Sequence, residues 1–172
     1  REPASPRPVA GGFPHTPAGA ATAATAWLQG APDALTNGTW DATVSAFVTP
    51  TFQAVARRAD PGAALMQSRL NAPHAPPYAV RIWPLGFAVS QYSPTSARVR
   101  VWQLGVLEIA RPTDVIGYTT TTVSLQWLGG DWKIAGILHG PALTPPGSTS
   151  TATEVTAWIA AVKQLHSYSY AP

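Results

Sequence analysis

Four histidines are the first candidates for chemistry, because an imidazole titrates near neutral pH and binds metals. They are His15, His74, His139 and His166. No two of them have the H-x-x-H or H-E-x-x-H spacing that places two ligands on one helix face. A zinc site would need ligands that converge from separate elements, and we predict no metal centre. We expect His15 to be a loop residue packed on the first helix, and His139 to be a side chain at a sheet edge.

Carboxylates are the other candidates for a general base. Asp41 follows Trp40 at the start of a predicted helix, where it could face a cavity. We prefer the alternative, a first-turn carboxylate that the helix dipole stabilises. Glu108 and Asp114 are expected at the surface, and Asp131 in a hairpin turn, where aspartate makes local hydrogen bonds. None of the four stands out as a catalytic base.

Other catalytic signatures are missing from the sequence. It contains no G-x-S-x-G or S-x-x-K motif and no glycine-rich phosphate loop. It also has no cysteine, which excludes disulfides, thiolate metal sites and a cysteine nucleophile. We therefore predict a protein that is not an enzyme and has no cofactor.

Composition indicates one folded domain with proline-rich ends. The chain has 172 residues, of which 45% are hydrophobic and 11% charged, with a net charge of +3. No basic run exceeds two residues, so we expect no nucleic-acid binding. No apolar stretch approaches the roughly 20 residues that a membrane span needs.

The first predicted element is a helix within "GFPHTPAGAATAATAWLQ". Thr16 is the expected N-cap and Pro17 the first helical residue. Gly30 and then Pro32 are expected to end the helix. Its apolar stripe consists of Ala20, Ala23, Ala24, Trp27 and Leu28. Further helices are predicted over residues 39–48, capped near Thr39, and over 50–59 and 61–70.

From Tyr78 onward the pattern is typical of strands, predicted over residues 78–92, 97–110, 118–128 and 132–140. Gly129, Gly130 and Asp131 form a tight hairpin turn between the last two. One face of the third strand is expected to be covered by the rest of the domain, and the other face to be more exposed to solvent. The covered face carries Thr119, Thr121, Val123, Leu125 and Trp127.

A last helix is predicted from Thr153, its expected cap, with an apolar stripe that includes Trp158 and Ile159. The order of elements indicates an α+β fold, in which N-terminal helices pack on a curled, cone-shaped antiparallel sheet of four strands. Residues 1–12 are predicted to be a proline-rich stalk, 13–141 the cone-shaped domain, 142–152 a linker, and 153–172 the C-terminal helix and tail. We expect most of the seven tryptophans in the core, filling the space inside the curl.

This order of elements resembles the nuclear-transport-factor-two-like superfamily over residues 13–141. Three segments make the resemblance more specific: "GFPHTPAGAATAAT", "ARVRVWQLGV" and "TVSLQWLGGDWKIAGILHGP". They look like extracytoplasmic proteins of actinobacterial conjugative elements, in which a glycine-aspartate-tryptophan turn, a basic residue and a Gly-Pro exit recur. Those proteins are similar to the periplasmic domain of the inner-membrane assembly factor of type IV secretion systems.

The resemblance implies a scaffold that associates with itself and with other membrane proteins of the transfer apparatus. It implies no catalytic residue, and a location on the extracytoplasmic side of the cell membrane. The anchor would be a membrane helix outside this chain. The C-terminal helix lies beyond the part of the chain that the resemblance covers.

Five residues are candidates for partner binding: Arg81, Arg98, Arg100, Trp102 and Trp158. The combination of arginine and tryptophan on one strand face is typical of protein interfaces. Ordinary outward-facing charge is an equal alternative.

The alternative function is a small-molecule binder, or an isomerase-like or cyclase-like enzyme, that uses the cone cavity. A polar pocket around Asp41 would favour it, and a cavity packed with tryptophan would argue against it. An accessory domain of a cell-envelope protein unrelated to transfer is a third possibility.

Overall fold

A computed structural model describes residues 9–58, 78–109 and 115–167. The described elements are α1 (Pro17–Thr36), α2 (Trp40–Phe47), α3 (Pro50–Arg57), β1 (Tyr78–Tyr92), β2 (Ser96–Ile109), β3 (Val115–Leu128), β4 (Asp131–Gly140), α5 (Ala152–Val162) and the two-residue strand β5 (His166–Ser167). The helix predicted over 61–70 lies outside the described residues, as do His74 and Asp114.

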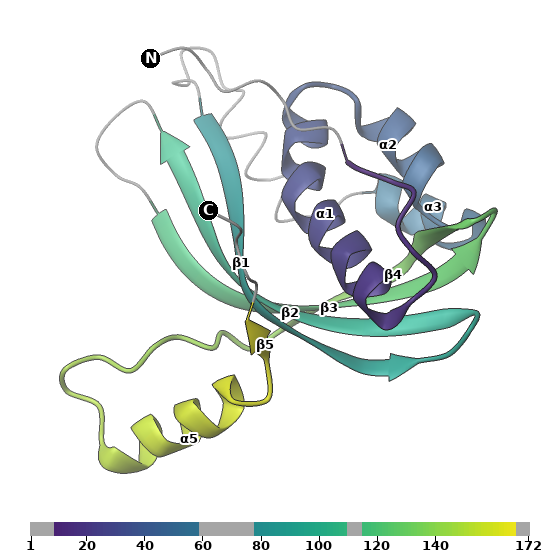
Figure 1. Ribbon diagram of the computed structural model, residues 1–172. Coiled ribbons are helices and arrows are strands. Elements are labelled where there is room, and N and C mark those ends of the chain that lie inside the picture. Colours follow the sequence, from purple (N-terminus) through teal and green to yellow (C-terminus); the bar gives the residue numbers. More distant parts are fainter. Residues whose placement is uncertain (1–8, 59–77, 110–114, 168–172) are drawn as a thin grey trace, which may run out of the picture.

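The strands form one antiparallel sheet in the order β4-β3-β2-β1-β5, which does not close into a barrel. The sheet curls around α1, and α2 and α3 lie on the same side (Figure 1). On this concave face Val99, Val101 and Val123 are completely buried. The C-terminal helix α5 lies on the opposite, convex face (Figure 1). The predicted α+β class, with N-terminal helices on a curled sheet and a C-terminal helix, is confirmed.

Helix α1 begins as predicted. The Thr16 hydroxyl accepts a hydrogen bond from the Gly19 N–H at 3.0 Å, and Pro17 follows the cap. All five residues of the predicted stripe are buried, at 8% exposure or less. This stripe of small side chains lets the helix lie close against the concave face.

The predicted end of α1 is wrong, because the helix continues to Thr36 with Pro32 inside it. An internal proline costs a helix about 3 kcal/mol, so burial of the last turns, including Ala34 at 4% exposure, outweighs the local stop signal. Gly30 has another role: a Cβ there would lie 2.7 Å from Cγ2 of Val9. Val9 itself packs against the core, so the folded part of the chain includes residue 9.

The turn into α2 is made by Asn37 and not by a Thr39 cap bond. Thr39 occupies the N-cap position, but its side chain makes no cap hydrogen bond. The Asn37 side-chain oxygen instead accepts hydrogen bonds from the N–H and hydroxyl of Thr39, at 3.1 and 2.6 Å. Val44 and Val48 are buried as the helical pattern indicates.

The predicted faces of β3 are confirmed where the core is tightest. Thr121, Val123 and Leu125 are at most 1% exposed. Thr120, on the face predicted to be more exposed to solvent, is also buried at 5%, and its hydroxyl donates to the carbonyl of Pro141 at 2.7 Å.

Helix α5 begins at Ala152, and its cap is Thr151 and not Thr153 as predicted. The Thr151 side chain accepts from the Glu154 N–H, and the Glu154 carboxylate accepts from the Thr151 backbone, which completes a capping box. The helix contacts its own domain: the ring centroids of Trp158 and Trp102 are 6.1 Å apart, and β5 pairs with β1 at Gly86 and Phe87.

Candidate functional site

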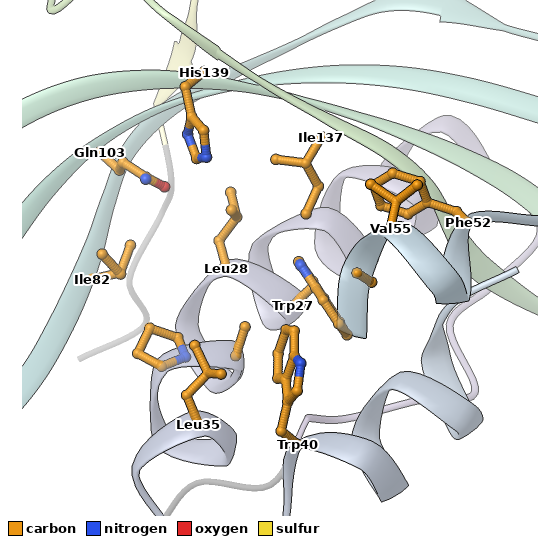
Figure 2. A pocket seen from close by; sticks show the side chains of 13 residues that line it. Trp27, Leu28, Leu35, Trp40, Phe52, Val55, Ile82, Gln103, Ile137 and His139 are labelled. Carbon is orange, nitrogen blue, oxygen red and sulfur yellow. The ribbon is translucent and has the colours of Figure 1, made fainter. Parts of the chain in front are cut away.

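A cavity of about 410 Å³ lies between the helices and the concave face of the sheet (Figure 2). We call it the concave pocket. Its walls are mostly apolar and come from α1, α2, α3 and the sheet. The lining includes Trp27, Leu28, Trp40, Phe52, Ile82, Gln103, Ile137 and His139.

The expectation that most tryptophans lie in the core, filling the space inside the curl, holds only in part. Trp27 and Trp132 are core residues at 2% exposure each, and Trp40 and Trp127 are partly buried against the same core. Trp102 packs against Trp158 on the convex face, and Trp83 is 40% exposed. Because much of this aromatic volume lies elsewhere, a cavity remains beside Trp27.

Two polar side chains, Gln103 and His139, meet at one end of the concave pocket (Figure 2). Gln103 is 6% exposed, and its amide nitrogen donates to the hydroxyls of Thr119 and Thr121, at 3.2 and 3.4 Å. His139 Nδ1 lies 3.3 Å from the Thr121 hydroxyl. Among the described residues, the Gln103 oxygen Oε1 has no hydrogen-bond partner, although it is buried.

Sequence analysis did not find Gln103 as a site residue. The available signal was a polar side chain at an inward position of an alternating strand, after Val99 and Val101. His139 was expected at a sheet edge, and β4 is indeed the edge strand. Its ring also lines the concave pocket, which only the register with β3 reveals.

Asp41 does not line the pocket, so the preferred interpretation of this carboxylate is confirmed. It lies in the first turn of α2, its side chain is 85% exposed, and it forms an ion pair with Arg57 at 3.5 Å. Asp131 has the turn role predicted for it: its carboxylate accepts from the backbone N–H groups of Phe13 and Trp132, at 3.2 and 2.9 Å. The side chain of Glu108 lies outside the described part of the chain.

His15 packs on the β3–β4 hairpin and not on α1 as expected. Its ring stacks on Trp127 with a centroid distance of 4.1 Å and an interplanar angle of 10°. Its Nε2 is hydrogen-bonded to the carbonyl of Pro94, in the β1–β2 turn. His15 therefore joins the entry to α1 to two hairpin turns. These contacts account for a histidine at this position without a catalytic role. Within the described ranges, no three histidine or carboxylate side chains lie close enough together to hold a metal ion.

Among the predicted partner-binding residues, two border a groove of about 690 Å³ on the convex face. We call it the convex groove; its polar lining is Ser90, Arg98, Arg100, Thr122, Ser124 and Gln164. Trp102 and Trp158 contact each other beside it. Arg81 lies on β1 opposite Val106, and it is not among the described residues that line the groove.

Positive charge and unpaired donors gather around the convex groove. Arg98 is exposed, and Arg100 Nη2 donates to Gln164 at 3.5 Å. Three buried nitrogen donors have no acceptor among the described residues: Arg100 Nε, Trp102 Nε1 and Trp158 Nε1. No described carboxylate forms an ion pair with Arg98 or Arg100. The two arginines of this surface therefore carry positive charge that no described carboxylate neutralises.

Comparison with known proteins identifies a family without an assigned activity. The family described as Domain of unknown function (DUF8175) matches residues 4–160, and the chain belongs to it. No curated protein matches.

One solved structure that is similar to the chain is the intermembrane space region of the chloroplast protein ARC6. It is 12% identical, and the match covers 58% of this chain and 76% of that chain with a TM-score of 0.36. A likeness that weak carries no argument about fold or function. In the part of the chain that the structure describes, no helix has both the length and the apolar character to cross a membrane.

Proposed function

We propose that this domain is a non-enzymatic assembly component of a conjugative, type IV secretion-like transfer complex, and that it acts through protein–protein contacts. The link to transfer complexes rests on the sequence segments named above. So do the extracytoplasmic location and the membrane anchor outside this chain. The contacts we propose are with other copies of the chain and with membrane proteins of the transfer apparatus.

The unpaired arginine charge at the convex groove is the observation that carries this proposal. Arg98 and Arg100 line the groove, Arg98 is exposed, and no described carboxylate forms an ion pair with either. A partner that brings carboxylate oxygens to the groove would supply the acceptors that these guanidinium groups lack within the described residues.

The charges beside the groove favour an acidic segment as the occupant. Arg98 and Arg100 stand two residues apart on β2 and project from the same face. Carboxylates bound to arginine make strong, charge-assisted hydrogen bonds. Leu138, which is 69% exposed at the rim, adds apolar surface of the kind found in interface cores. We therefore propose that the convex groove binds an acidic segment of a neighbouring protein of the complex.

The concave pocket offers no set of catalytic groups to support an enzymatic alternative. Among its described lining residues there is no carboxylate, and His139 is the titratable side chain. General acid–base catalysis usually pairs such a group with a second acid or base, or with oxyanion donors. A single imidazole beside an amide supports binding better than turnover.

Crosslinking in the native membrane tests the proposal. The protein, expressed from its own gene, is crosslinked in its own cells, purified, and the attached proteins are identified. We expect recovery of further copies of the chain together with membrane proteins of a transfer apparatus. The double variant Arg98→Glu, Arg100→Glu should lose the partner while keeping its fold, because both charges are reversed at the groove.

Arg58→Glu is the matched control, because Arg58 is an exposed arginine at the end of α3, away from the convex face. It should leave recovery unchanged. Recovery of the protein alone, or full recovery of partners by the double variant, would contradict the proposal.

A further inference from the structure

We propose that the concave pocket binds a flat, largely apolar small molecule that carries one hydroxyl group. This inference is independent of the assembly role, since the pocket and the convex groove lie on opposite faces of the sheet. It concerns binding only and includes no chemical step.

The apolar walls define the body of the ligand. Trp27, Trp40 and Phe52 present aromatic rings, and Leu28, Ile82 and Ile137 present aliphatic groups (Figure 2). A volume of about 410 Å³ is within the range of small-molecule sites, roughly 300–1,000 Å³. Aromatic walls favour planar ligands, because rings gain most from offset or edge-on contact with other rings.

The buried Gln103 oxygen defines the polar group of the ligand. Both donations of the Gln103 amide nitrogen go to threonine hydroxyls of β3, which holds the amide plane in place. Its oxygen is left without a partner at 6% exposure, and the amide group is directed toward the pocket (Figure 2). A buried acceptor of this kind is satisfied by a donor, such as a hydroxyl hydrogen.

His139 completes the recognition of a hydroxyl. The Thr121 oxygen accepts from the Gln103 amide, and its own hydrogen can be donated to Nδ1 of His139, 3.3 Å away. In the tautomer that this donation requires, the ring hydrogen is on Nε2, which can then donate to a ligand in the pocket. A hydroxyl can donate to Gln103 and accept from His139 at once, whereas a carbonyl or ether oxygen can only accept.

A matched pair of probes tests this inference: 2-naphthol, and 2-methylnaphthalene, in which a methyl group replaces the hydroxyl. Binding is measured by titration, with the two-dimensional NMR signals of the Gln103 side-chain amide and the Trp40 indole as site-specific reporters. We expect 2-naphthol to bind roughly three- to tenfold more tightly, as one satisfied hydrogen bond allows. We also expect it to move both signals.

Two variants separate the polar group from the cavity. Gln103→Leu should reduce the preference for 2-naphthol to what the His139 contact alone provides while keeping the binding of 2-methylnaphthalene, because leucine keeps the volume and removes the acceptor. Ala31→Trp should block both probes, because Ala31 lines the pocket. Its control is Ala157→Trp, which adds the same side chain to exposed surface of α5.

Urea midpoints of all variants establish that each one folds. The comparison of the two probes on the unchanged protein does not depend on any variant. Equal affinity for the two probes would overturn the assignment of the hydroxyl. Binding in the concave pocket itself would be overturned if neither probe bound, or if binding survived Ala31→Trp.

Discussion

Gly19 provides a test in which local helix propensity and tertiary structure predict effects of opposite sign. Glycine inside a helix is less favourable than alanine by about 0.5–1 kcal/mol, so propensity alone predicts that Gly19→Ala stabilises the protein. In the fold, a Cβ at residue 19 would lie 1.9 Å from the carbonyl oxygen of Pro14. That oxygen already accepts hydrogen bonds from the Thr16 N–H at 2.8 Å and from the Trp132 indole at 3.0 Å.

The size of the destabilisation by Gly19→Ala follows from the displacement of the Pro14 carbonyl. Displacing the Pro14 carbonyl costs about 1–3 kcal/mol as overpacking, and loss of the Trp132 hydrogen bond about 0.5–1.5 kcal/mol. Subtracting the helix gain of about 1 kcal/mol leaves a net destabilisation of about 2 kcal/mol. With a urea m-value of about 2 kcal/mol/M, the midpoint should fall by about 1 M at unchanged slope.

Equilibrium urea unfolding, followed by tryptophan fluorescence, measures this shift. Gly147→Ala is the control: a Cβ there meets nothing within 4 Å, so the midpoint should stay the same or rise slightly. If Gly19→Ala proved as stable as the unchanged protein, Pro14 would not lie against the start of α1, and the described entry to the helix would be wrong.

The other predictions concern α5 and the hairpin. Trp158→Ala should free α5 from the convex face, because it removes the ring contact with Trp102. We expect faster proteolysis around residues 141–151 with little change in the urea midpoint. Ile159→Ala, on a residue that is 41% exposed, should not speed proteolysis, and equal rates for the two variants would contradict the docking. Hydrogen bonds from the backbone and side chain of Thr151 lower the pKa of Glu154 below 4.5. Its stabilisation of α5 is therefore complete above that pH and is lost as the pH falls through the lowered pKa. Helical circular dichroism between pH 6 and 3 should show this loss, which Glu154→Gln should remove while keeping the capping geometry; an identical profile would exclude the link. Asp131→Ala should lower the free energy of unfolding by about 1–2 kcal/mol, because two backbone N–H groups lose their acceptor. An unchanged urea midpoint would contradict this anchoring.

Local patterns predicted the elements well because each depends on neighbours in the chain. Thr16 and Pro17 identify the start of α1, and the alternation along β3 identifies its buried face. The local patterns gave wrong predictions where a distant contact outweighed a local preference. Pro32 does not end α1, since the last turns of the helix are packed against the rest of the domain.

The candidate site could be predicted only in part. Asp41 was assigned correctly as a first-turn carboxylate from its place in the helix. His15 was not, because its stacking partner Trp127 is more than a hundred residues away in sequence. Nothing in the pattern showed that the tryptophans would leave a cavity inside the curl.

The sequence by itself determined the α+β class, the order of the elements and which strand faces are apolar, because these follow from helical and alternating periodicity. Only the tertiary structure decided that Gln103, Thr121 and His139 form one polar group at the end of an apolar cavity. Gln103 and Thr121 stand eighteen positions apart, as do Thr121 and His139, and the register of the antiparallel strands brings the three side by side. A shift of one residue in that register would turn each side chain to the other face of the sheet, and no local pattern specifies the pairing between distant strands.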